Sequence, residues 1–117
     1  MTQTDAQPVW FAMRATYRRE MIAKRALETL GIESFVPMHY ELRREQGRMR
    51  RRLVPAIHNL IFVYAEPALL QAVKAKMPYL QYMTRRVEGQ VQGEKIVVPT
   101  AQMEAFMAAA GSLDEGM

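Results

Sequence analysis

Six arginines lie close together near the middle of this 117-residue chain, against a single acidic residue there, Glu45. An arginine side chain presents five N–H donors in a planar fork that matches the oxygens of a phosphate group. A cluster of one sign and one residue type therefore predicts a surface that binds an anionic partner. A run of exposed charges is more often simply solvated, so both interpretations stay open. The six residues are Arg43, Arg44, Arg48, Arg50, Arg51 and Arg52.

Catalytic chemistry finds little support in the residues. The two histidines, His39 and His58, have no acid or hydroxyl residue at the spacing of a catalytic triad or a metal motif, so each is expected to be a hydrogen-bonded structural histidine. The glycines of Gly89–Gly93 are too sparse for a phosphate-binding loop. The sequence contains no cysteine, hence no thiolate zinc ligand and no cysteine nucleophile. We therefore expect no enzyme activity, no metal and no cofactor.

The composition is that of one globular domain. The chain is long enough to bury a core without disulfides or metals, and 50% of its residues are hydrophobic. No segment approaches the roughly 18 consecutive apolar residues that span a bilayer, and the start of the chain does not resemble a signal peptide. The net charge of +4 is small, so the basic character is local. We expect a cytoplasmic monomer that does not enter membranes.

The first third of the chain reads as strand, helix, strand. Val9–Ala15 alternates with a period of two and carries aromatic residues, which predicts a strand. Thr16 is a good residue to cap the following amphipathic helix, and Gly31 is placed as the residue after its carboxyl end. Ile32–Leu42 is predicted as a second strand. Pro37 cannot donate a hydrogen bond within a sheet, so it should mark an edge or a bulge.

The middle of the chain predicts a loop, a buried strand and a second helix. The arginine cluster is interpreted as a loop centred on Gly47. The apolar run Leu60–Tyr64 has the composition of a strand near the centre of a sheet. Pro67 is placed at the first position of a helix that Pro78 would stop. Leu80–Val87 is then predicted as a fourth strand.

The elements add up to an α+β fold. After a short hairpin-like segment, Ile96–Val98 is predicted as a brief strand and Thr100 as the cap of a last helix. The order βαββαβ with an extra carboxyl-terminal helix is that of a ferredoxin-like antiparallel sheet with helices packed against it. We assign residues 1–8 to a flexible lead-in, 9–111 to the domain and 112–117 to the start of a linker. This architecture alone indicates no function.

The order of several segments resembles the amino-terminal (NGN) domain of NusG-type transcription elongation factors. The match is closest to specialised antiterminator paralogs of the RfaH and UpxY kind. General members of the family begin their third strand with phenylalanine-proline-glycine-tyrosine, and the different residues here favour a specialised paralog. The family normally carries a KOW domain after the linker. The segments are Trp10–Arg14, the basic helix, Gly31–Met38, the arginine loop, His58–Val63 and Ile96–Pro99, with Ile57–Leu60 in the place of the general pattern.

The resemblance implies that the domain binds the clamp helices of RNA polymerase through an apolar surface on its sheet. Aromatic and aliphatic groups on the open face of a sheet have the composition of an interface core. Residues of a central strand are also the usual core of a domain, so each of them has this second interpretation. The residues carried over from the family are Phe11, Ile57, Leu60, Phe62 and Tyr82.

The resemblance also implies contact with DNA in the transcription bubble. The arginine loop and the start of the first helix lie near that DNA in the family, with nascent RNA as a further candidate partner. This adds Arg14, Arg18 and Arg19 to the basic surface. Tyr17 among them could stack on a base, although such a tyrosine is more often packed. The expected activity is suppression of pausing and termination at long polysaccharide-biosynthesis operons.

An RNA-recognition module of the RRM type is the alternative interpretation. It has the same order of elements, and Phe62–Tyr64 weakly resembles its aromatic RNA-stacking motif. The basic and glycine residues that should precede those aromatics are replaced by Asn59–Ile61. An interaction domain with incidental arginines is the third interpretation.

Overall fold

A five-stranded antiparallel sheet organises the computed structural model, which describes the backbone of residues 7–115 and side chains through residue 110. The strands lie in the order β2-β5-β1-β6, and β9 pairs with the same edge of β1 as β6 does, further along the strand. Since β5 lies between β2 and β1, the unit β1-α1-β2 is a split βαβ motif. The predicted α+β, ferredoxin-like class is confirmed. The strands are β1 Val9–Ala15, β2 Glu33–Phe35, β5 Leu60–Ala65, β6 Leu80–Tyr82 and β9 Val97–Val98.

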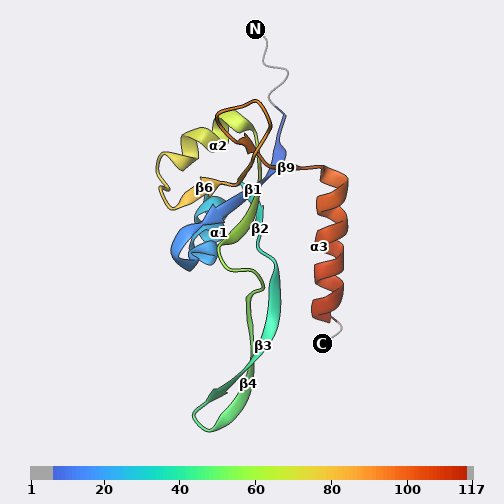
Figure 1. Ribbon diagram of the computed structural model, residues 1–117. Coiled ribbons are helices and arrows are strands. Elements are labelled where there is room, and N and C mark those ends of the chain that lie inside the picture. Colours follow the sequence, from blue (N-terminus) through green and yellow to red (C-terminus); the bar gives the residue numbers. More distant parts are fainter. Residues whose placement is uncertain (1–6, 116–117) are drawn as a thin grey trace.

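Helices cover both faces of this sheet (Figure 1). On one face, the helices α1 (Glu20–Thr29) and α2 (Pro67–Lys74) bury the main hydrophobic core. The fully buried side chains there include Met13, Ile61 and Leu80. The helix α3 (Thr100–Glu115) lies on the other side of the sheet. Every second side chain of β1 and β5 points to the face under α1 and α2, and these side chains form the sheet side of the core. Its other fully buried members include Leu27, Val63 and Leu70.

The start of α1 differs from the prediction. Thr16 does not cap the helix: Thr16–Arg18 forms one 3₁₀ turn, η1, and α1 begins only at Glu20. The hydroxyl of Thr16 instead donates to the carbonyl of Tyr79, at 3.4 Å. Two residues with positive φ in this turn interrupt the helical path, which moves the start of α1 along the chain.

The end of α1 is as predicted. Gly31 has φ 76°, in the left-handed region that glycine adopts without a steric penalty. Its N–H donates to the carbonyl of Glu28, and the N–H of Ile32 donates to the carbonyl of Leu27, both at 2.9 Å. This is the Schellman motif, and it satisfies two carbonyls that a helix end would otherwise leave without partners.

The predicted second strand is two strands that belong to different sheets. Pro37 separates β2 from β3 (Met38–Glu45), which pairs with β4 (Arg48–Pro55). We expected Pro37 to mark an edge or a bulge, and it follows the end of β2, which is the edge strand of the main sheet. The β3–β4 hairpin projects far from the body of the domain (Figure 1).

The prediction of a loop for the arginine cluster was wrong. The arginines lie on the two strands of the hairpin, and the turn is only two residues, Gln46 and Gly47. Their φ angles of 53° and 78° fit a type I′ turn, whose twist matches that of paired strands. The charges hid the strand pattern, since a two-stranded ribbon with solvent on both sides tolerates charge on either face.

The last elements also depart from the predicted lengths. The fourth strand divides at Met83, after which β7 (Thr84–Arg85) and β8 (Glu94–Lys95) form the expected short hairpin. The helix α2 ends at Lys74, before Pro78, because the following residues form tighter turns.

The carboxyl-terminal helix is where it was predicted, but Thr100 is its first residue and not its cap: the N–H of Met103 donates to the carbonyl of Pro99 at 3.0 Å. It continues through Glu115, so its backbone is helical within the segment 112–117 that we assigned to a linker; that boundary stays a prediction. No helix of the described chain is both long and apolar enough to cross a membrane.

Candidate polymerase and nucleic-acid interfaces

The register of the β3–β4 hairpin divides the six arginines between two faces. Paired residues of an antiparallel ladder share a face, and successive residues alternate. Arg43 pairs with Arg50 on one face, whereas Arg44 pairs with Met49 on the other. We call the first the charged face: His39, Glu41, Arg43, Glu45, Arg48, Arg50 and Arg52. We call the second the apolar face: Tyr40, Leu42, Arg44, Met49, Arg51 and Leu53.

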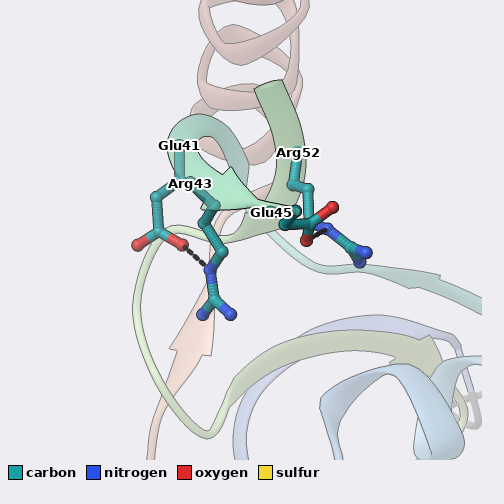
Figure 2. A network of polar contacts seen from close by, with 4 residues as sticks. All are labelled: Glu41, Arg43, Glu45 and Arg52. Atoms are coloured by element: carbon teal, nitrogen blue, oxygen red, sulfur yellow. Dashed lines mark hydrogen bonds and ion pairs between the residues drawn. The ribbon is translucent and has the colours of Figure 1, made fainter. Parts of the chain in front are cut away.

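Two ion pairs lie on the charged face (Figure 2). The Nε of Arg43 is 3.0 Å from Oε1 of Glu41, and the Nε of Arg52 is 2.6 Å from Oε2 of Glu45. Exposed pairs of this kind stabilise a fold by about 0–1 kcal/mol and are screened by salt. Their main effect is to orient the two guanidinium groups. The charged face keeps an excess of positive charge, because the exposed Arg48 and Arg50 make no ion pair within the described chain.

The charged face and the start of α1 border one pocket of about 390 Å³. Arg18 and Arg43 both line it, although they are far apart in the sequence. His39 and His58 line it too, and neither side chain makes a hydrogen bond to another described residue, contrary to expectation. The carboxylates of Glu20 and Glu41 line it as well, so the two arginines are balanced within the pocket itself. The pocket joins the two predicted basic segments into one surface, and the excess positive charge of that surface lies on the adjacent hairpin.

A strained turn presents Tyr17 and Arg18 beside this pocket. Their φ angles are 58° and 55°, values that cost non-glycine residues conformational energy. The N–H of Arg18 donates to Oδ1 of Asn59 at 2.7 Å, and the N–H of Asn59 donates to Oε2 of Glu20 at 2.6 Å. Glu20 is only 2% exposed, so the turn is held by a carboxylate anchored inside the domain.

Tyr17 and Arg19 are available to a partner at this turn, and Arg14 lies elsewhere. The Tyr17 side chain is 82% exposed, and the Arg19 guanidinium lies 5.5 Å from its ring centre. Arg14 is exposed on the α3 side of the sheet, where it lines a pocket of about 280 Å³ with Ile57 and Leu60. Arg14 is therefore closer to the predicted polymerase-binding residues than to the arginines of the hairpin.

Three of the five predicted polymerase-binding residues lie together. Leu60 and Phe62 are half-buried on the α3 side of the sheet, and Ile57 is 52% exposed just before them. This face is not open, in contrast to the expectation. The ring of Phe106 in α3 packs edge-on against Phe62 at 5.8 Å and against Phe35 at 5.7 Å.

The other two residues lie on the opposite face. Phe11 is 3% exposed and belongs to the core, and Tyr82 is paired with Met13 on the same side. The two rings meet edge-on at 5.4 Å. The expected single stripe of five residues is therefore wrong as geometry, because Phe11 pairs with Val63 on the core face whereas Leu60 and Phe62 lie on the opposite face of β5.

Tyr82 has polar surroundings at the edge of the core. Its hydroxyl donates to Oε1 of Gln71 at 3.2 Å, and the Nζ atoms of Lys74 and Lys95 lie 5.2 and 4.1 Å from its ring centre. Burial raises the pKa of the Tyr82 hydroxyl above its ordinary value of 10.0. These contacts within the domain account for the position of Tyr82 without a partner molecule.

Comparison with protein families identifies the family of this chain. Residues 8–107 match the family described as transcription termination factor nusG. The chain belongs to the NusG family. The match covers the sheet, the hairpin and the first half of α3, so both candidate surfaces of this NusG domain lie within it. A comparison with curated proteins found no match.

The NusG domain is therefore a domain of a transcription elongation and termination factor. Its geometry gives no support to the RRM alternative. In that alternative, aromatic residues of the sheet must be open to stack on RNA bases. Here Trp10 is 3% exposed and contacts Tyr64, and Phe62 packs against Phe106.

Two residues that hold the candidate site were not identified from the sequence. Glu20 resembles any acidic residue in the first turn of a helix, where it would favour the helix dipole. Asn59 carried a weak signal, since asparagine is enriched at positive φ. In the structure its φ is 69°. Their partnership links positions far apart in the chain, and only the fold brings them together.

Proposed function

We propose that this NusG domain binds the clamp helices of RNA polymerase through the α3 side of its sheet. The family match over residues 8–107 is the observation that carries the proposal. Leu60, Phe62 and the exposed Ile57 supply an apolar patch on that side, and Phe106 of α3 extends it. Aromatic and aliphatic side chains that are partly exposed beside one another are the usual core of a protein interface.

Bound in this way, the domain suppresses pausing and termination by favouring the closed clamp. A ligand shifts a conformational equilibrium only by the difference in its affinity for the two states. The domain must therefore bind the closed clamp more tightly than the open one. A bridge from the clamp to the nucleic acid supplies such a difference, because both contacts are made together only when the clamp is closed.

The charged face of the hairpin and the Tyr17–Arg19 turn contact the DNA of the transcription bubble. Arg48, Arg50 and the pocket shared by Arg18 and Arg43 support this role. The exposed ring of Tyr17 is suited to stack on an unpaired base. Nascent RNA would present the same phosphate chemistry to this surface.

We further propose a specialised antiterminator that acts as a monomer at long polysaccharide-biosynthesis operons. The residues Ile57–Leu60, which replace the general family pattern, support the specialised role. Asn59 holds the strained turn, His58 lines the pocket beside it, and all four residues line the smaller pocket with Arg14, so altered side chains here would change which nucleic acid is recognised. A KOW domain is expected to follow the linker.

A pull-down with core RNA polymerase, run beside one with an isolated clamp-helix fragment, tests the polymerase contact. We expect the domain to bind both. Binding to the whole enzyme without the fragment would place the contact elsewhere on polymerase. Binding to single-stranded RNA alone, with no retention of polymerase, would favour the RNA-binding alternative.

A further inference from the structure

The apolar face of the hairpin has no role in the function proposed above. Leu42 is 65% exposed, Met49 is 56% exposed and Leu53 is 47% exposed. All three lie on the same side of the ribbon by the register of β3 and β4. Isolated apolar residues at a surface are ordinary, but a row of them on one face of a projecting element indicates a binding surface.

The hairpin carries this face away from the domain. The molecule measures 61 × 34 × 29 Å, and the hairpin forms one end of its long axis (Figure 1). Its strands pair only with each other among the described residues. A two-stranded ribbon alone is marginally stable in water, so a partner that covers one face would also order it.

We propose that the apolar face docks on a protein surface of the elongation complex, an apolar patch bordered by carboxylates. This inference rests on the proposed function and adds a second polymerase contact to it. The two faces of a ribbon point in opposite directions. With the charged face on DNA phosphates, the apolar face points away from the DNA. The hairpin then lies between nucleic acid and protein.

The charges on the apolar face select the chemistry of its partner. Arg44 and Arg51 lie among the apolar residues, and the Arg51 guanidinium is 4.5 Å from the ring centre of Tyr40. A carboxylate on the partner would pair with Arg44. A second copy of this chain is a poorer partner, because stacked ribbons about 10 Å apart would bring like charges together.

The test uses the full chain with Leu42→Ser, Met49→Ser and Leu53→Ser combined. These side chains are largely exposed, so the thermal midpoint should change little. The matched control combines Arg43→Gln, Arg48→Gln and Arg50→Gln on the charged face. Binding is measured to core RNA polymerase without nucleic acid and to an assembled elongation complex over a range of salt concentrations.

We expect the apolar-face variant to bind core polymerase about tenfold more weakly, an effect typical of interface side chains. The control variant should keep its affinity for core polymerase and show a weaker salt dependence on the elongation complex. Met49→Ser alone, next to the turn, should reduce affinity in the same direction by a smaller factor. It replaces the combined variant if that protein fails to fold.

Three results would overturn the inference. Unchanged affinity of the apolar-face variant for core polymerase, while Leu60→Ser binds more weakly, would leave the proposed function standing without this second interface. A concentration-dependent dimer that the apolar-face substitutions abolish would identify a second copy as the partner. Weaker binding to free DNA alone would make the face a base contact. Failure of the unmodified chain to bind polymerase would instead refute the proposed function.

Discussion

At the scale of single residues, the candidate site depends on a brace of two hydrogen bonds made by Glu20 and Asn59. The buried carboxylate of Glu20 accepts the N–H of Asn59, and the side chain of Asn59 accepts the N–H of Arg18. These bonds hold the left-handed turn that exposes Tyr17. A residue fixed before binding loses less conformational entropy on binding, so the brace should favour affinity as well as stability.

Substitutions at Asn59 distinguish the stability contributed by its side-chain hydrogen bond from that contributed by its backbone conformation. Asn59→Gly removes the acceptor of the Arg18 N–H but tolerates the φ of 69°, so it should destabilise the fold by about 0.5–1.5 kcal/mol. Asn59→Ala should cost about 1 kcal/mol more, because alanine is strained at positive φ. Urea unfolding measures both. Equal destabilisation by the two variants would mean that the left-handed backbone imposes no constraint.

The titration of Tyr82 should appear in the pH dependence of stability. Burial raises its pKa in the folded state above the ordinary value of 10.0. The folded state therefore binds the phenolic proton more tightly than the unfolded state does. Its contribution is complete below pH 10 and is lost as pH rises through the folded-state pKa.

Chemical unfolding of the wild type and Tyr82→Phe between pH 8 and pH 11 measures this contribution. Phenylalanine keeps the ring contact with Phe11 and has no proton to lose. We expect the wild type to lose more stability than the variant as pH rises above about 10. Parallel curves for the two proteins would contradict a raised pKa.

At the scale of elements, the hairpin changes what the arginine cluster can do. In a loop, six arginines could converge on one partner. On paired strands, the register sends Arg44 and Arg51 to one face and the other four to the opposite face. Salt dependence of binding should therefore follow the face on which a charge lies as well as the number of charges.

Reversing Arg48 and Arg50 to glutamate should weaken binding to an elongation complex and reduce its salt dependence. Each phosphate that the protein no longer neutralises lowers the slope of log K against log salt by about 0.7–0.9, so the double variant should lower it by up to about two. Arg25→Glu with Arg86→Glu is the control, since it makes the same change in net charge at exposed sites away from the hairpin. If both pairs change the slope equally, the effect comes from net charge and the charged face has no specific contact.

The elements that the sequence predicted well are those with strong local signals. β1 and β5 have aromatic and β-branched residues in a row, and Gly31 has a local reason to end α1. The hairpin was predicted as a loop because its charges obscured an alternation that needs only backbone pairing to form. The sequence predicted an edge or a bulge at Pro37, but it did not predict two separate strands there. Which strand a segment pairs with is a property of the whole fold, and no local signal specified it.

The site residues show the same division between local and distant information. Their chemical types were evident from the sequence, but their faces depended on register. Phe11 and Leu60 looked alike as apolar strand residues, yet one lies in the core and the other at the edge of the α3 side. Glu20 and Asn59 gave no signal of partnership, because the hydrogen bond between them spans most of the first half of the domain.

At the scale of the whole molecule, the sheet separates stability from recognition. The side covered by α1 and α2 holds the main core, with Phe11 and Met13 buried there. The α3 side carries the aromatic group of Phe35, Phe62 and Phe106, which is covered less completely. A polar substitution should therefore have different consequences on the two sides.

Leu60→Ser and Phe11→Ala compare the two sides directly. Leu60→Ser should reduce affinity for core polymerase about tenfold or more while the thermal midpoint falls only slightly, because the side chain is half-exposed. Phe11→Ala should cost about 3–5 kcal/mol of stability, since it leaves a cavity in the core. Thermal melts and polymerase binding by the fraction that remains folded measure both effects. Any weakening of binding by folded Phe11→Ala should be small. A Leu60→Ser protein that melts early and binds normally once folded would show that the α3 side serves stability, and the polymerase contact would have to lie elsewhere on the domain.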